Sequence, residues 1–142
     1  MPLKSKIPYR NRSPCGWWWY REIQQWVSDR QKKLRPKSRC LVWENTCIIK
    51  AKDRDHAFEK AMRLGGRGHP SRTLAGEWRF AGISHLSPIY DDLEDGAEIF
   101  WDDRGFIPVS RIKKLVKSKK QLSVFDDSEK NPTRPPDTTH VM

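Results

Sequence analysis

The stretch Gly16-Trp17-Trp18-Trp19-Tyr20-Arg21-Glu22-Ile23-Gln24-Gln25-Trp26-Val27 is the most aromatic part of the chain. Trp, Tyr, Ile and Val dominate it and no helix breaker interrupts it, so residues 16–27 predict a β-strand. Side chains alternate between the two faces of a strand. The face expected to point toward the core carries Trp17, Trp19, Ile23 and Val27. The other face carries Trp18, Tyr20, Glu22, Gln24 and Trp26, which a helix must cover unless they remain available to a partner.

The residues that follow predict a second strand antiparallel to the first. The polar segment 28–38 is typical of an exposed connection, and residues 39–51 again alternate. The apolar face of this second strand is expected to carry Leu41, Trp43, Cys47 and Ile49.

A helix comes next, with Asp53 as its N-cap and Gly65 at its end. Its apolar stripe is expected to cover a sheet face and consists of Ala57, Phe58, Ala61 and Leu64. Further strands are predicted at 74–80 and 97–101. A second helix begins near Pro108, and the residues expected to point inward from it are Val109, Ile112, Leu115 and Val116.

This element order predicts an α+β fold with a mostly antiparallel sheet of about four strands and two helices. The ordered part is expected to be a single small domain over residues 15–125. A basic N-terminal tail (1–14) and a polar C-terminal tail (126–142) are rich in proline and poor in periodic apolar residues, so both are expected to be unstructured.

Several segments together resemble the small bacterial domain-of-unknown-function family 4288, over about residues 16–116. The resemblance rests on the aromatic opening, Ile48-Ile49-Lys50-Ala51, the helix from Asp55 to Ala61, Trp78-Arg79-Phe80-Ala81-Gly82-Ile83 and, most specifically, Ile89-Tyr90-Asp91-Asp92-Leu93-Glu94-Asp95-Gly96-Ala97-Glu98. It implies a compact bacterial α+β module with no established activity. This chain departs from the pattern in its basic front and its three consecutive tryptophans.

Composition limits the class of protein further. The 142 residues carry a net charge of +10, with no apolar run long enough to cross a membrane and no secretory signal at the start, so a cytoplasmic protein is expected. The charge is segregated along the chain: residues 1–40 carry +9, residues 88–110 carry −6 and residues 111–122 carry +6. The net charge alone therefore does not indicate a nucleic-acid-binding protein.

The sequence contains no recognisable catalytic motif. The acids at 91–95 could hold Mg²⁺, but their spacing around Asp95-Gly96 is more typical of a solvated turn. The glycine-rich loop at 65–72 follows a helix and lacks the Lys-Ser/Thr of a phosphate-binding loop. No zinc spacing links the cysteines and histidines. We therefore expect no catalytic residue, no metal and no cofactor.

The leading hypothesis is a non-catalytic protein-interaction module, in an accessory or immunity-type role, whose partner surface consists of Trp18, Tyr20 and Trp26. A nucleic-acid-binding protein is the alternative, with phosphate contacts from Arg12, Arg21, Lys113, Lys114 and Lys117. A metal-dependent hydrolase using the acids at 91–95 is a third hypothesis. A homo-oligomer is compatible with each of them.

Overall fold

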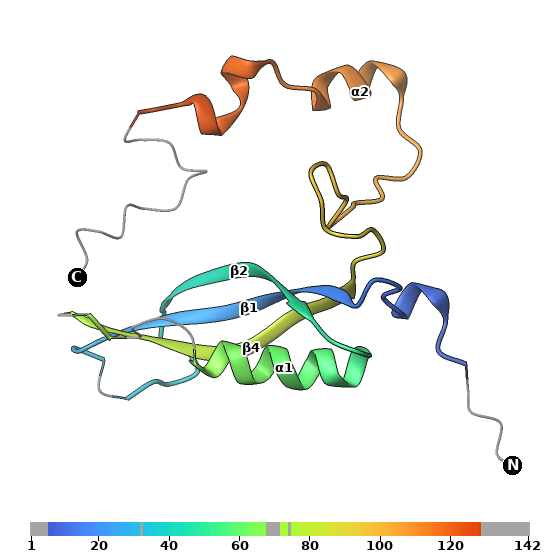
Figure 1. Ribbon diagram of the computed structural model, residues 1–142. Coiled ribbons are helices and arrows are strands. Elements are labelled where there is room, and N and C mark those ends of the chain that lie inside the picture. Colours follow the sequence, from blue (N-terminus) through green and yellow to red (C-terminus); the bar gives the residue numbers. More distant parts are fainter. Residues whose placement is uncertain (1–5, 32, 68–71, 74, 129–142) are drawn as a thin grey trace, which may run out of the picture. The chain divides into compact units, whose positions relative to one another are not determined.

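The computed structural model describes residues 6–31, 33–67, 72–73 and 75–128 (Figure 1). It groups the chain into a first unit, Met1–Trp101, and a second unit, Asp102–Met142, and the predicted domain over 15–125 spans both. Parts of the predicted tails (1–5 and 129–142), residues 68–71 of the glycine-rich loop and Leu74 lie outside the described residues.

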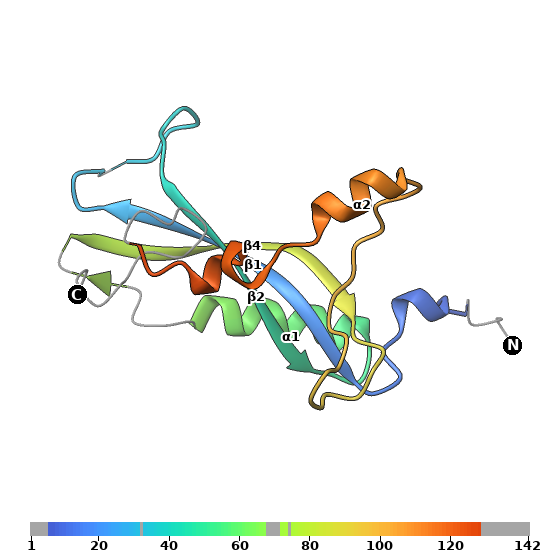
Figure 2. The same ribbon diagram turned by 90° about the horizontal axis from the view of Figure 1, so that it is seen from above.

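An antiparallel sheet forms the body of the first unit. Its strands are β1 (Trp17–Ser28), β2 (Leu41–Lys50), β3 (Arg72–Thr73) and β4 (Gly76–Pro88), in the spatial order β2-β1-β4-β3. Strand β1 pairs with β2 along ten residues and with β4 on its other side, so the aromatic stretch is the central strand (Figure 2). The prediction of an α+β fold with a mostly antiparallel sheet is confirmed.

The fourth strand is not the one that the sequence predicts. Residues 97–101 form no strand, whereas the two-residue β3 pairs with the start of β4. The central strand β1 already has a partner on each side, and the 97–101 segment instead places the Phe100 ring against Trp19. Its apolar residues therefore cover part of a sheet face and do not extend the sheet.

Helix α1 (Arg54–Arg67) lies along one face of the sheet (Figure 1). The carboxylate Oδ1 of Asp53 accepts a hydrogen bond from the backbone N–H of His56 at 2.8 Å, which confirms the predicted N-cap. The helix runs two residues beyond Gly65, its predicted end.

Helix α1 covers the face of β1 that carries Trp18 and Tyr20, which is one of the two outcomes expected for this face. Both residues are buried in one cluster with Ala57 and Ala61 of α1. On the face expected to point toward the core, Trp19 and Val27 are buried as well, outside that cluster. The face carrying Trp17 and Trp19 lies on the opposite side of the sheet. The predicted apolar face of β2 is confirmed at Ile49, which belongs to this core, and at Cys47, which packs against it, in register with Trp18 and Tyr20. Leu41, which the sequence assigns to the same face, is 54% exposed.

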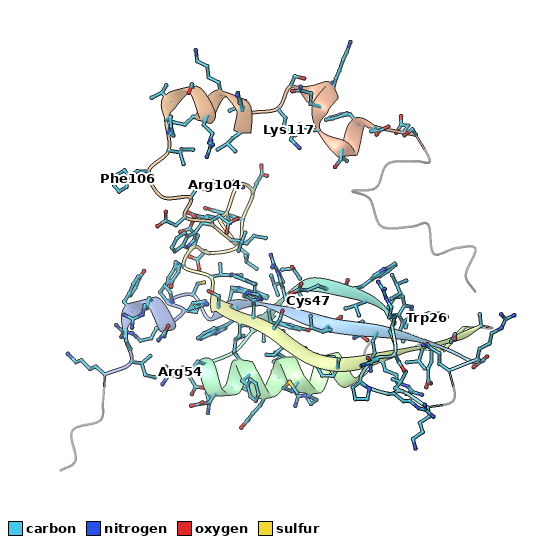
Figure 3. The ribbon with its side chains drawn as sticks, turned by 180° about the vertical axis from the view of Figure 1, so that it is seen from behind. Trp26, Cys47, Arg54, Arg104, Phe106 and Lys117 are labelled. Carbon is cyan, nitrogen blue, oxygen red and sulfur yellow. The ribbon has the colours of Figure 1, made fainter. Side chains whose placement is uncertain are left out.

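The second unit contains α2 (Val109–Leu115) and two single-turn 3₁₀ helices, η2 (Lys119–Gln121) and η3 (Ser123–Phe125). The predicted second helix is therefore present, but none of its residues is buried, and the residues expected to point inward are exposed. Phe106, which precedes α2, is fully exposed (Figure 3). In the part of the chain that the structure describes, no helix has the length and apolar character needed to cross a membrane.

Small residues on α1 determine how closely the helix approaches the sheet, and alanine substitutions at two neighbouring glycines test this. A Cβ at Gly65 would overlap the Phe80 ring of β4, whereas a Cβ at Gly66 would meet no atom within 4 Å. We expect Gly65→Ala to lower the free energy of unfolding by roughly 1–3 kcal/mol through overpacking. Gly66→Ala should raise it by about 0.5–1 kcal/mol because alanine is the better helix former.

Urea unfolding followed by circular dichroism measures both changes. A double variant, Gly65→Ala with Phe80→Leu, should lose less stability than the sum of the single variants because the shorter side chain relieves the overlap. Equal effects of the two glycine substitutions would show that α1 does not rest on Phe80.

Candidate functional site

The segment that follows β4 is held in place by residues near the N-terminus. The carbonyl oxygen of Ile89 accepts hydrogen bonds from Ser13 Oγ at 2.8 Å and from Cys15 Sγ at 3.1 Å, and the Ile89 N–H donates to Trp17 O at 2.9 Å. Ile89 itself is almost completely buried. The loop after β4 therefore begins from a fixed point at the end of the sheet.

A short 3₁₀ helix, η1 (Tyr9–Asn11), makes a second attachment to this loop. The Tyr9 ring stacks on Tyr90 with 5.3 Å between ring centroids, and Tyr90 Oη donates to Arg10 O at 2.5 Å. The prediction of an unstructured tail over residues 1–14 thus does not hold for residues 9–13, which pack against the end of β4.

Between these attached segments lies an aromatic cleft of about 340 Å³ on the sheet face opposite α1. Its lining includes Trp19 of β1, the end of β4, and residues of the loop and of η1: Arg10, Tyr90, Asp91, Glu98, Ile99, Phe100 and Trp101. Phe100 meets the Trp19 ring edge-on, at 5.2 Å between centroids and 88° between planes. Trp19 is 7% exposed, whereas Trp101 is 62% exposed, so the cleft combines a buried floor with an open aromatic rim.

Charged groups of both signs surround the cleft. The guanidinium of Arg21 lies 5.8 Å from the Trp19 ring centroid and 5.5 Å from that of Phe100, within the range of a cation–π contact. Asp91 and Glu98 supply carboxylates on the loop side, and Asp91 Oδ2 also accepts a hydrogen bond from the Glu98 N–H at 3.4 Å. The cleft therefore offers apolar contact together with separate positive and negative groups.

A polar cluster continues from the cleft across the open sheet face. Ser84 Oγ donates to Glu44 Oε1 at 2.5 Å, and His85 Nδ1 lies 3.0 Å from the same hydroxyl. The His85 ring stacks on Trp19, which links this cluster to the cleft floor. In an activated-serine site the imidazole stands between hydroxyl and carboxylate, but here the hydroxyl stands between them. His85 Nδ1 also lies 3.8 Å from Glu44 Oε1, so the three polar side chains form one cluster beside the cleft floor.

The predicted aromatic partner surface is largely inside the protein. Trp18 and Tyr20 are 3% and 4% exposed because α1 covers them, and Trp18 Nε1 donates to Ala51 O at 3.2 Å. Trp26 is partly buried and stacks at a tilt on Trp78, with 5.3 Å between ring centroids, near the end of β1 (Figure 3). These three residues therefore do not form one exposed surface.

The predicted phosphate contacts belong to two separate units. Arg12 is exposed beside η1, and Arg21 lies over the rings of the cleft in the first unit. Lys113 and Lys114 lie in the last turn of α2, with Lys117 just beyond it, all exposed in the second unit (Figure 3). Neither unit brings all five together.

The acidic segment at 91–95 forms a turn, as the sequence predicts. Gly96 has a φ of +86°, and the Ala97 N–H donates to Glu94 O at 2.9 Å. Across the described ranges, no three His, Cys, Asp or Glu side chains gather in a way that could hold a metal ion.

The residues that form the rim of the cleft were not predicted as a site from the sequence. Ile99, Phe100 and Trp101 follow the acidic segment as three consecutive large apolar residues, which we assigned to a strand. The run itself could have indicated the rim, because three large apolar residues outside a paired strand must either be covered by other residues or leave an apolar surface.

The first unit is thus a small α+β module in which one helix covers one sheet face and an anchored loop forms a cleft on the other. The family model described as domain of unknown function (DUF4288) matches residues 22–101, more than half of the chain, and the chain belongs to this family. The match ends at the residue that ends the first unit. Searches of curated proteins and of solved structures found no match.

Burial of Tyr20 gives the protein a testable response to alkaline pH. Removal from water raises the pKa of the Tyr20 phenol well above its ordinary value, and the neighbouring Cys47 adds to this effect. Burial likewise raises the pKa of the Cys47 thiol. For Tyr20, a pKa raised in the folded state means that the stabilisation is complete below about pH 10 and is lost as the pH rises further. For Cys47 the loss begins lower, near the ordinary pKa of a thiol at about pH 9.

We expect the free energy of unfolding to fall by about 1.4 kcal/mol per pH unit above pH 10 from Tyr20 alone. Tyr20→Phe should remove this part of the pH dependence, while the exposed Tyr9 gives a matched control, Tyr9→Phe, that retains it. Urea titrations between pH 8 and pH 11 measure the slopes. Identical slopes for the two variants would show that Tyr20 ionises as freely in the folded protein as in the unfolded chain.

Proposed function

We propose that this chain is a non-catalytic protein-interaction module that binds its partner in the aromatic cleft. The observation that carries the proposal is the apolar rim: Ile99, Phe100 and Trp101 are 45%, 44% and 62% exposed around a floor formed by buried Trp19. Tryptophan and other aromatic side chains beside a pocket are the residues that most often dominate the binding energy of protein interfaces.

The surroundings of the cleft suit a peptide segment of another protein. Such a segment would place an apolar side chain over Trp19 and present its own charges to Arg10 on one side and to Asp91 and Glu98 on the other. The hydrogen bonds to Ile89 and the stacking of Tyr9 on Tyr90 support this role because they order the cleft before a partner arrives. An accessory or immunity-type role is compatible with a module of this size.

Replacing a rim residue tests the proposal. A photo-crosslinking amino acid at position 101 should form an adduct with the partner in the native host, which mass spectrometry identifies. With that partner purified, Phe100→Ala should weaken binding by at least about thirtyfold in calorimetry, the loss typical of a central aromatic anchor. Phe58→Ala is the matched control, since Phe58 is 50% exposed on α1, on the other side of the sheet.

The variants are compared only after their unfolding midpoints match that of the parent protein. An absence of any adduct at position 101, or equal binding by Phe100→Ala and Phe58→Ala, would contradict a partner in the cleft.

Nucleic-acid binding is a second candidate, supported by one observation in the second unit. All six basic residues between 111 and 120 are exposed: Arg111, Lys113, Lys114, Lys117, Lys119 and Lys120. Such a run can contact a phosphate backbone without sequence preference.

Fluorescence anisotropy with single-stranded and duplex DNA and RNA tests this candidate. If it holds, affinity falls steeply with added salt, and Lys113→Ala combined with Lys114→Ala reduces the salt dependence by about two phosphate contacts. Absence of binding at low salt would eliminate it.

A further inference from the structure

The two long strands that flank β1 differ in how their outer edges are protected. Strand β4 carries two bulges, where Ala81 and Ser84 are extra residues relative to β1, and Gly82 between them has a φ of +141°. Bulges of this kind distort an edge and prevent another chain from pairing with it. Strand β2 has an uninterrupted register with β1 from Leu41 to Lys50.

The side chains of β2 add little protection to its edge. Residues 41–49 contain one charged side chain, Glu44, and no proline or glycine. Leu41, Val42 and Ile48 are 54%, 53% and 45% exposed. A long, apolar edge with an unbroken register, in an otherwise basic protein, is the type of edge that pairs with another strand.

The backbone of β2 is also largely available. Beyond its ladder with β1, one further hydrogen bond to this backbone occurs among the described residues, from Lys60 Nζ to Lys50 O at 2.8 Å. Residues 41–49 therefore retain the outward-pointing N–H and C=O groups that pairing with another antiparallel strand would use.

We propose that the chain forms a symmetric dimer in which β2 pairs antiparallel with β2 of a second copy, centred on Asn45. A two-fold axis perpendicular to the sheet keeps the helix-covered faces of both copies on the same side. In this register, apolar residues meet apolar residues. The cross-strand pairs are Leu41 with Ile49, Val42 with Ile48, Trp43 with Cys47, and Glu44 with Thr46.

The neighbouring registers that keep the same faces together are less complementary. A centre at Glu44 places that carboxylate opposite its own copy, and like charges directly opposite destabilise a sheet. A centre at Thr46 places Val42 opposite Lys50 and Glu44 opposite Ile48. The Asn45-centred register is therefore the one that avoids both mismatches.

The Glu44–Thr46 pair brings no like charges together. Within one copy both side chains bind toward the centre of the sheet: Thr46 Oγ1 accepts from Arg21 Nε of β1 at 3.3 Å, and Glu44 Oε1 accepts from Ser84 Oγ of β4. The pair therefore fits this register without a charge clash, and its hydrogen bonds stay inside each copy.

Sedimentation equilibrium of the full chain over a range of concentrations tests the dimer. Val42→Lys with Ile48→Lys should raise the dimer dissociation constant by at least about tenfold, because a lysine then faces a lysine twice. Val42→Lys with Ile48→Glu should restore pairing, because each introduced charge then faces its opposite. Both positions are exposed in the monomer, so folding is expected to be retained.

The register has a separate test. Under mild oxidation, Asn45→Cys should form a disulfide-linked dimer because position 45 meets itself on the two-fold axis. Thr46→Cys is the matched control and should not, because in this register it faces position 44. A monomer at every concentration, dimerisation unaffected by the two lysines, or preferential crosslinking through position 46 would overturn the proposal. Binding to the aromatic cleft is measured with different variants and can fail independently.

Discussion

The close approach of α1 to a sheet face filled with aromatic rings is the constraint on which the rest of the first unit depends. Trp18 and Tyr20 project from β1 into this face, and a helix can pack over such large side chains only where its own are small. Ala57 and Ala61 are completely buried there, and Gly65 leaves room for the Phe80 ring. Once α1 occupies this face, the remaining surfaces for binding are the opposite face and the sheet edges.

The opposite face acquires its shape from segments distant in sequence. Ser13 and Cys15 bind the carbonyl of Ile89, and eleven residues further along the chain Phe100 lies against Trp19. The cleft and the edge of β2 are therefore different kinds of surface: one has ordered aromatic side chains, and the other has unpaired backbone. The cleft and the edge of β2 have no residue in common, so the two proposed uses do not compete for the same groups.

The sequence predicted the elements better than their orientation. The alternation in β1, the N-cap at Asp53 and the apolar face of β2 follow from local patterns, and each is present. Both faces of β1 carry large apolar residues, however, so the pattern alone could not tell which face α1 covers. The cleft could not be predicted from local patterns either. Phe100 and Trp19 are 81 positions apart in the sequence, and their contact depends on the attachment of Ile89.

Three tryptophans at one end of the sheet come from three different strands. Trp43 of β2 and Trp26 of β1 both contact Trp78 of β4, with 4.8 and 5.3 Å between ring centroids. Indole rings this close couple their electronic transitions, and the coupling depends on their mutual orientation. The near-ultraviolet circular dichroism of the protein therefore reports the alignment of β2, β1 and β4, and no added label is needed to measure it.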